Sequence, residues 1–381
     1  MRGLALGVLA IGLVLPAAAA DLKQATVEQL EQAVAADLGK PDADLAVELA
    51  GLELTERLSA ARLKRLEAEA PGGKAQQALQ ALADESAFLD LPAADLPADA
   101  APDRAEKIAI LNRAIDFVSK TVPRLPNFFA TRDTTRFEDT PSETSRIAAD
   151  SIPYKPLHAV DSSSVIVLYR DGHELVEDEA ATDGTAKADG KKKKRKTGRH
   201  AMSTAGEFGP ILTTVVGDAV HGQVIFSHWE HGAAGQLAVF RYTVPKEASH
   251  YAVTVPGIGE ETQETPAYHG EIAVNPVDGS ILRMTMQAEL NPAGSVARAD
   301  LMVDYGPVEI GGKTYICPVR SVALSRVRMI HRLLSEARML NAVFGPFQTR
   351  LNDVVFTDYH LFRVEMRILT DDAAQPQTTP R

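Results

Sequence analysis

The residues with the clearest capacity for chemistry lie in the sequence FSHWEHG, residues 226 to 232. Imidazole and carboxylate groups bind zinc in proteins, and this stretch supplies them through His228, Glu230 and His231. Alternate side chains of a strand point to opposite faces, so His228 and Glu230 share one face while His231 lies on the other. Further histidines occur in the same half of the chain: His221, His250 and His269. One hypothesis is therefore a metal-assisted hydrolase, and the other is that these residues lie on the solvated face or at the rim of a sheet, with Trp229 packing below.

Signatures of other enzyme classes are missing from the sequence. It contains no nucleophile elbow, no zinc-protease helix motif and no phosphate-binding loop. The single cysteine, Cys317, lies in TYICPVR, where strand-forming neighbours favour a buried, inert thiol over a reactive thiolate. We therefore expect a protein that is not an enzyme, with no catalytic residue, no bound metal and no cofactor.

A second pattern predicts a binding face. Apolar and polar residues alternate strictly from Leu282 to Leu290, as in a strand with one buried and one solvated face. Methionine side chains adapt to varied apolar ligands, and this strand carries Met284 and Met286. Apolar positions on neighbouring predicted strands extend the same face. The candidate ligand-lining residues are Phe226, Phe240, Tyr242, Leu282, Met284, Met286, Leu301 and Val303.

The composition limits the classes of partner. The chain has 381 residues, 45% of them hydrophobic and 24% charged, with a net charge of -11. An acidic chain has no general attraction to nucleic acid or to anionic membrane, so we expect no nucleic-acid partner. The exception is residues 177 to 200, in which Lys191 to Lys196 are all basic. We expect a disordered, solvated loop there, and the alternative is contact with a phosphate-rich glycolipid or nucleic acid.

The first 20 residues have the features of a secretory signal peptide. Arg2 precedes an apolar run from Leu4 to Leu15, and the small residues Ala17 to Ala20 offer a cleavage site. This run is too short to span a bilayer, and no later stretch is long and apolar enough to do so. We expect a periplasmic or secreted protein, cleaved near Ala20.

Periodicity divides the remaining chain into parts. Residues 21 to 90 predict an all-α helical segment, residues 91 to 104 a Pro- and Ala-rich linker, and residues 371 to 381 a flexible tail. Residues 105 to 370 predict a helix, about Arg104 to Lys120, followed by a sheet domain. Local signals support this reading: Thr26 and Ser59 stand at helix N-caps, and Asp171-Gly172, Asp278-Gly279 and Gly311-Gly312 at hairpin turns.

From about Phe128 the hydrophobic period changes to two. Strands are predicted at residues 127–132, 164–169, 224–230, 237–244, 250–255, 270–274, 281–290, 299–305, 308–310, 313–318, 321–328 and 354–361. Residues 329 to 344 look helical instead. Because hairpins follow one another without strand–helix–strand alternation, the sheet should be antiparallel. The predicted fold class is α+β: a curved antiparallel sheet forming an unclosed half-barrel with covering helices, plus the N-terminal helical segment.

Three stretches resemble a known family. YHGEIAVNPVDGSILRMTMQAEL, ARADLMVDYGPVEIGGKTYICPVRSVALS and VVFTDYHLF are similar to the late strands of the outer-membrane lipoprotein carriers. The chain also resembles secreted bacterial proteins that join an Ala-rich helical segment to such a sheet. The resemblance covers roughly residues 125 to 365. It implies a strongly curved half-barrel whose helices cover a hydrophobic concavity, which in the carriers accepts acyl chains.

Three functions are compatible with these features. The first is an exported, non-enzymatic protein that binds an apolar or lipidic ligand, or a lipidated partner, in a concave face left partly open. The second is a structural or protein-interaction module without a cavity, whose helical segment docks a partner. The third is the metal-assisted hydrolase built on His228, Glu230 and His231.

Overall fold

The architecture is an α+β fold built around one large, unclosed antiparallel sheet. A computed structural model describes residues 22–37, 39–144, 151–176, 206–257, 261–334 and 340–362. The predicted signal peptide, the basic loop at 177–200 and the tail at 371–381 lie outside the described residues. The described α-helices are α1 (Val27–Asp37), α2 (Asp42–Ala50), α3 (Ala60–Glu69), α4 (Gly73–Glu85), α5 (Arg104–Lys120) and α6 (Pro210–Ala219).

The large sheet has ten strands, each antiparallel to its neighbours. In spatial order they are β7 (His173–Val176), β6 (Lys155–Arg170), β3 (Phe128–Thr140), β16 (Leu340–Leu361), β15 (Lys313–Leu334), β14 (Val296–Ile310), β13 (Ile281–Ala288), β12 (Tyr268–Val274), β9 (Gly235–Val244) and β8 (Gln223–Gly232). Three short pairs complete the described strands: parallel β1 (Lys23–Ala25) with β2 (Leu52–Leu54), and antiparallel β4 (Glu143–Thr144) with β5 (Ser151–Ile152) and β10 (Val253–Val255) with β11 (Thr262–Glu264). The predicted fold class is confirmed, with the addition that the helical segment contains the β1–β2 pair.

Local sequence signals explain where several elements begin and turn. Thr26 and Gln29 form a reciprocal capping box, at 3.0 and 3.2 Å, and the Ser59 hydroxyl accepts from the Arg62 amide at the start of α3. In the Asp278-Gly279 turn, Gly279 has a φ of 78°, and a Cβ there would lie 2.3 Å from the Arg113 carbonyl of α5. Glycine at this turn therefore lets the β12–β13 hairpin approach the helix.

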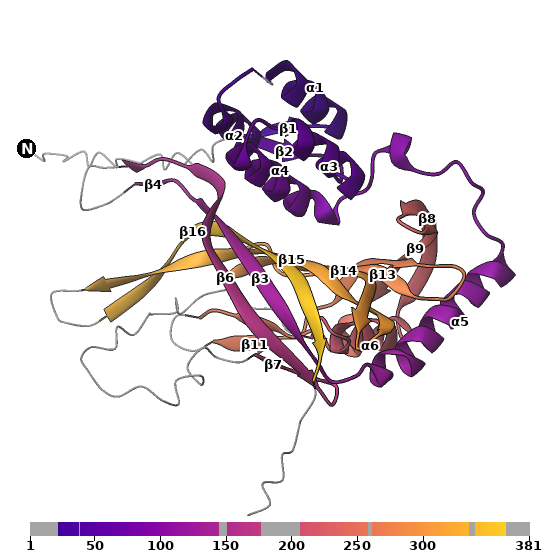
Figure 1. Ribbon diagram of the computed structural model, residues 1–381. Helices are drawn as coiled ribbons and strands as arrows, with labels where there is room; N and C mark the ends of the chain where they lie inside the picture. The colour runs from indigo at the N-terminus through magenta and orange to yellow at the C-terminus, as the bar shows by residue number, and fades with distance from the viewer. Residues whose placement is uncertain are drawn as a thin grey trace, which may run out of the picture.

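One predicted element is wrong. Residues 329 to 344 were expected to be helical, but the described part of this stretch extends β15 and β16 into one long hairpin, with Ile330 opposite Phe344. Figure 1 shows this hairpin projecting beyond the neighbouring strands. The apolar residues of this stretch fit either period, and cross-strand pairing outweighs its local helix propensity.

Helices cover both faces of the sheet. We call the face beneath α5 and α6 the inner face, and the opposite face, beneath the helical segment of residues 22 to 90, the outer face. In Figure 1 the helical segment lies above the sheet, and the chain after it runs round the β8 end to α5. The predicted linker is attached to that end, because the Trp229 Nε1 donates to the Ala100 carbonyl at 2.9 Å and Gln236 donates to Asp99 at 2.6 Å.

Candidate functional site

The predicted ligand-lining residues mostly meet on the inner face, and they are buried. Phe240, Tyr242, Met284, Met286, Leu301 and Val303 belong to one apolar cluster, and each is 4% exposed or less. Phe226 is half-buried against the same cluster, with the Lys107 ammonium 5.5 Å from its ring centre. The structure therefore brings these residues together as the sequence predicts.

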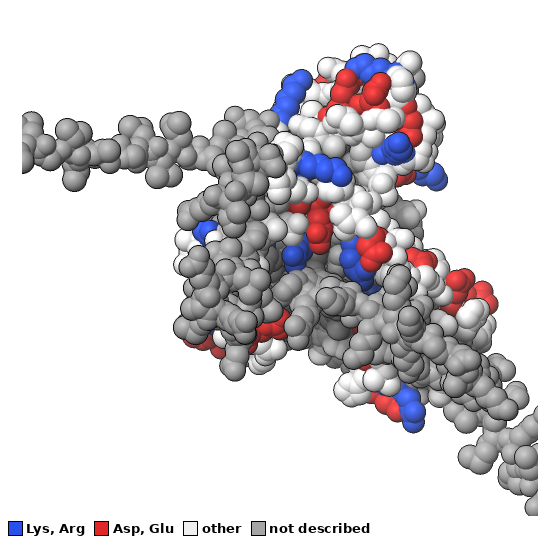
Figure 2. All heavy atoms as spheres, turned by 90° about the vertical axis from the view of Figure 1, so that its left-hand side faces the viewer, with Lys and Arg blue, Asp and Glu red and all other residues white. Residues whose placement is uncertain are grey.

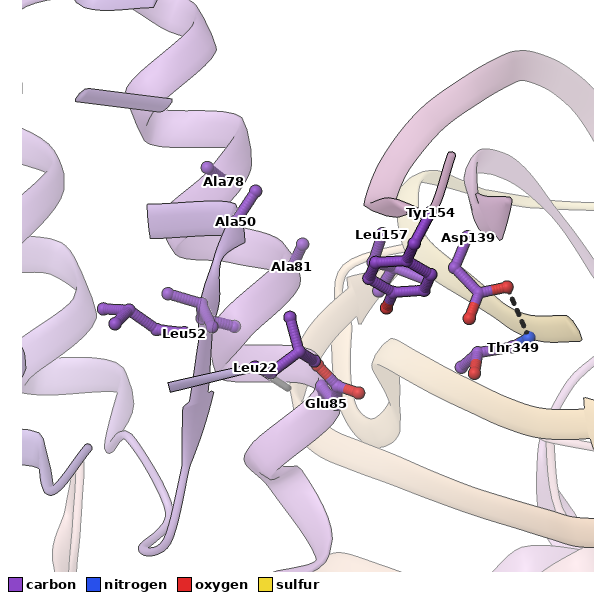
Figure 3. Close-up of a pocket in the computed structure, with 11 residues that line it drawn as sticks. Leu22, Ala50, Leu52, Ala78, Ala81, Glu85, Asp139, Tyr154, Leu157 and Thr349 are labelled. Atoms are coloured by element: carbon purple, nitrogen blue, oxygen red, sulfur yellow. Dashed lines mark hydrogen bonds between the residues drawn. The ribbon is translucent and has the colours of Figure 1, made fainter. Parts of the chain in front are cut away.

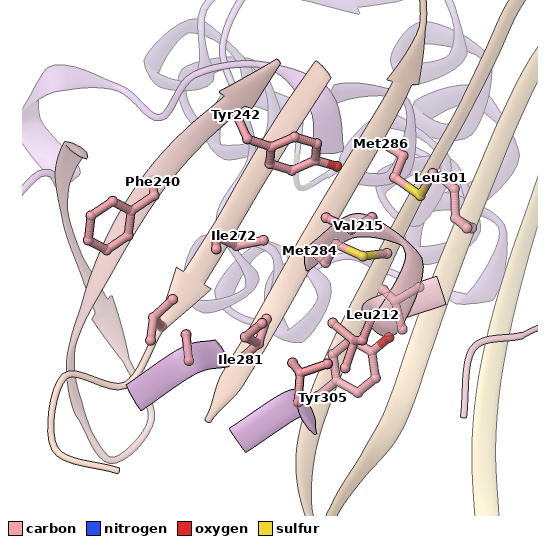
Figure 4. Close-up of a cluster of buried hydrophobic side chains, with 14 of the residues drawn as sticks. Leu212, Val215, Phe240, Tyr242, Ile272, Ile281, Met284, Met286, Leu301 and Tyr305 are labelled. Atoms are coloured by element: carbon pink, nitrogen blue, oxygen red, sulfur yellow. The ribbon is translucent and has the colours of Figure 1, made fainter. Parts of the chain in front are cut away.

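Within the part of the chain that the structure describes, this cluster is covered rather than left partly open, which differs from the expectation drawn from the sequence. Helix α5 places Ile110, Ala114 and Val118 against it, and α6 adds Leu212 and Val215. Figure 4 shows Leu212 and Val215 lying over the strands that carry Met284 and Ile272. In this structure the protein's own helices occupy the space that a ligand would take.

The prediction that Leu282 lines the inner face is wrong. A β-bulge lies in this stretch, because Val274 is opposite Ile281 and Ala273 is opposite Arg283, which leaves Leu282 as the extra residue. Leu282 consequently packs with Leu237, Val239 and Ala273 on the outer side, while Ile281 takes its place in the inner cluster. A bulge shifts the side-chain alternation by one residue, and the sequence pattern alone did not reveal it.

Helix α6 is anchored to the sheet by one buried carboxylate. Asp218, 3% exposed, accepts hydrogen bonds from the Tyr268 hydroxyl at 2.9 Å and from the His250 amide at 2.8 Å. The His250 ring Nδ1 lies 2.7 Å from Oδ1, the other carboxylate oxygen of Asp218. Since Tyr268 belongs to β12, Asp218 ties the end of α6 to the sheet beside the apolar contacts of Leu212 and Val215.

The predicted histidine cluster does not form a metal site among the described residues. His228 and Glu230 share one face as expected, with the His228 Nε2 3.8 Å from Glu230, but Glu230 is buried rather than solvated; His231 is exposed. The remaining candidates lie elsewhere: His250 contacts Asp218, and His269 contacts Glu289 at 3.4 Å. Cys317 is fully buried, and burial raises the pKa of its thiol to about 12, as fits an inert side chain.

Glu230 instead belongs to a group of ion pairs between the helical segment and the outer face. Arg57 of the helical segment donates to Glu230 at 2.7 Å, and Arg283 of β13 pairs with the same oxygen. Burial would raise the pKa of Glu230, but the His228 ring and the Arg283 and Arg57 guanidiniums outweigh it and hold this pKa well below its ordinary value. Glu230 is 8% exposed and Arg57 5%. Removing either side chain would therefore leave the other as a buried charge without this partner, which destabilises the fold.

A second ion-pair centre joins α4 to the same face. Asp84, with no exposed surface, pairs with Arg320 of β15, which also donates to Asp353 of β16 at 2.9 Å. Around these charges, Ala81 and Ala87 pack against Met302, Val322 and Leu324. The polar side of the strands, predicted to be solvated, is thus covered by the helical segment.

Comparisons with known proteins found no match to this chain. The chain matches no protein-family model. Neither the curated proteins nor the solved structures include a match to it. None of the helices that the structure describes is both long and apolar enough to cross a membrane.

The contact between the helical segment and the sheet also contains a carboxyl group whose raised pKa should make the stability of the protein depend on pH. Burial, with the nearby Glu53 carboxylate, raises the pKa of Glu85 to about 7 from an ordinary value of 4.5. The folded state therefore favours the protonated form, so this group costs little below about pH 4.5 and destabilises the protein increasingly as the pH rises from there through 7.

We expect the free energy of unfolding to fall by about 2 kcal/mol between pH 5 and pH 8 through this group. Urea denaturation across this range should show the loss, and Glu85→Gln should remove it. If Glu85→Gln and the exposed-site control Glu28→Gln have the same pH profile, Glu85 is not the group responsible.

Proposed function

We propose that this protein is an exported, non-enzymatic binding protein that takes an apolar chain, from a lipid or a lipidated partner, between the inner face and α6. The observation that carries the proposal is how the inner face is covered. The sheet does not close on itself, and two separate helices, one of only ten residues, shield its apolar side. The resemblance to the lipoprotein carriers supports the same use of a half-barrel.

Because the inner face is filled, a ligand must replace side chains that already lie there. Displacing α6 exposes Leu212 and Val215 fully and the half-buried Ile211 and Val216 in part. At about 1.5–3 kcal/mol for each fully buried side chain, the cost is on the order of 5–8 kcal/mol. A chain of fourteen methylenes recovers about 11 kcal/mol at about 0.8 kcal/mol each, before the cost of association.

The balance between the cost of displacing a helix and the gain from burying an apolar chain differs for α5 and α6. Displacing α5 as well would remove Ile110 and Val118 from the core and uncover the half-buried Leu111 and Phe117. That adds on the order of 6–10 kcal/mol and brings the total to about 11–18 kcal/mol, which is more than a single chain returns once the cost of association is included. We therefore assign the movement to α6 alone and keep α5 as a fixed part of the core.

Native mass spectrometry of the full chain, incubated with palmitate and then exchanged into detergent-free buffer, tests the proposal. We expect one retained palmitate per chain. Met284→Glu should abolish retention, because a carboxylate would replace a fully buried methionine. Val355→Glu, at an outer-face position that is 39% exposed, is the matched control and should retain palmitate.

A second candidate is a structural or protein-interaction module, and the filled inner face favours it. In that case the sheet is a solid scaffold, covered on both sides, and the helical segment of residues 22 to 90 meets a partner. Palmitate would then not be retained even by the wild-type chain. This outcome would reject the binding proposal whether or not Met284→Glu folds.

A further inference from the structure

A pocket lies where the helical segment meets the sheet, away from the inner-face cluster. Its wall on the helical side is apolar, formed by Leu22, Leu52, Ala78 and Leu82. Its other wall carries Asp139 and Tyr154, and Glu85 projects from the end of α4. Figure 3 shows Leu52 and Ala78 on one side of the pocket and Tyr154 and Asp139 on the other. The empty space is about 400 Å³ with the open solvent at its mouth included, so only a small molecule would be enclosed.

The charges around this pocket are unequal. Three carboxylates act on one another there, from Glu53, Glu85 and Asp139. The guanidiniums that offset them belong to Arg298 and Arg326. Arg298 already pairs with Asp300 and lies 5.5 Å from the Phe88 ring centre. Arg326 in turn lies 5.2 Å from the ring centre of Phe347. The carboxyl groups therefore outnumber the guanidiniums at this apolar, half-enclosed site.

Buried carboxylates are stable when a cation or hydrogen-bond donors accompany them. Asp139, 8% exposed, accepts from the Thr349 amide at 2.8 Å and also from the Thr349 side chain, so its hydrogen bonds come from one neutral residue. Burial raises the pKa of Asp139 as well as that of Glu85, so both groups resist ionisation while no further cation is present. Both also raise the pKa of Tyr154, to about 12, after the larger effect of its burial.

We propose that this pocket binds a small organic ammonium ion. Its NH₃⁺ group would lie between Glu85 and Asp139, beside the Tyr154 hydroxyl, and its short alkyl chain would lie against Leu52 and Leu82. A metal ion fits less well, because in the part of the chain that the structure describes these carboxyls do not converge into a metal-binding group. The apolar wall also matches an alkyl chain better than a hydrated ion.

Isothermal titration calorimetry of the full chain with n-butylammonium chloride at pH 8 tests this proposal. We expect saturable binding that neither 1-butanol nor butyrate shows, since only the ammonium ion carries the complementary charge. Glu85→Gln and Asp139→Asn should each weaken binding at least about tenfold. Glu28→Gln, on the exposed side of α1, should leave it unchanged.

The pH gives an independent check. Binding should weaken from pH 8 to pH 5.5, because Glu85 then takes up a proton and no longer attracts the ammonium group by its charge. Equal binding of 1-butanol, the absence of binding, or unchanged affinity in both pocket variants would overturn the proposal. None of these outcomes bears on palmitate, whose proposed site is the inner face.

Discussion

Replacing Glu230 with glutamine is expected to lower the free energy of unfolding by about 3–5 kcal/mol, measured by urea denaturation at pH 7. Glu230 is 8% exposed and pairs with both Arg57 and Arg283. The variant would take from two largely buried guanidiniums the carboxylate that both contact, and that penalty exceeds the loss of an ordinary hydrogen bond. Since Arg57 belongs to the helical segment, the loss should appear first as weaker attachment of this segment to the sheet.

The matched control is Glu289→Gln, which removes a carboxylate that contacts His269 with both side chains about half exposed. Exposed pairs contribute at most about 1 kcal/mol, so the control should unfold almost as the wild type does. Stability should also decline in acid, because a carboxylate with a lowered pKa stabilises the fold above its unfolded pKa and loses this effect as pH falls. If the two variants have equal stability, the buried ion pairs do not hold the helical segment.

Asp218→Ala is expected to change stability and ligand affinity in opposite directions. The variant removes the acceptor of the buried Tyr268 hydroxyl and of the His250 amide, which costs about 2–4 kcal/mol in the free energy of unfolding. The same loss weakens the attachment of α6. A larger population with α6 displaced should then raise palmitate affinity about tenfold, as measured by fluorescent fatty-acid displacement.

Asp116→Ala is the control for this variant, because Asp116 is a mostly exposed residue of α5 that pairs only with Lys120 in the part of the chain described. It should alter neither quantity by more than a small amount. A fall in palmitate affinity in Asp218→Ala, parallel to the fall in stability, would show that α6 forms part of the bound state rather than an obstacle to it.

Local features of the fold were predictable from the sequence. The capping box of Thr26 and Gln29 and the N-cap of Ser59 depend on residues three positions apart. The two-residue turn at Gly311-Gly312 depends on backbone conformations that glycine adopts without strain. The predicted helix from Arg104 to Lys120 is confirmed with the same bounds, because its apolar positions recur at helical spacing.

Features that depend on distant residues were not predictable. The polar residues of β13 were expected to face solvent, yet Arg283 meets Glu230, 53 positions away, and Arg57 meets the same carboxylate from 173 positions away. No local pattern distinguishes a solvated arginine from one covered by a separate segment. The wrong face predicted for Leu282 has a similar cause, because the position of a bulge is set by the register with the partner strand.

The candidate site was predicted in part. Alternation brought Met284, Met286 and their neighbours to one face, since the period of a strand fixes which residues share a side. The occupation of that face by Leu212 and Val215 could not be predicted, because α6 was not recognised as a helix in the sequence. Its ten residues follow a stretch without apolar periodicity, and a short helix has a weak pattern of its own.

Hydrogen–deuterium exchange with and without palmitate tests the central claim most directly, because it reports separately on α6 and on the sheet. If an apolar chain takes the place of α6, amides of residues 211 to 219 should exchange faster in the presence of palmitate, while those of β13 stay protected. Unchanged exchange in α6 at a saturating palmitate concentration, or slower exchange there, would contradict the account.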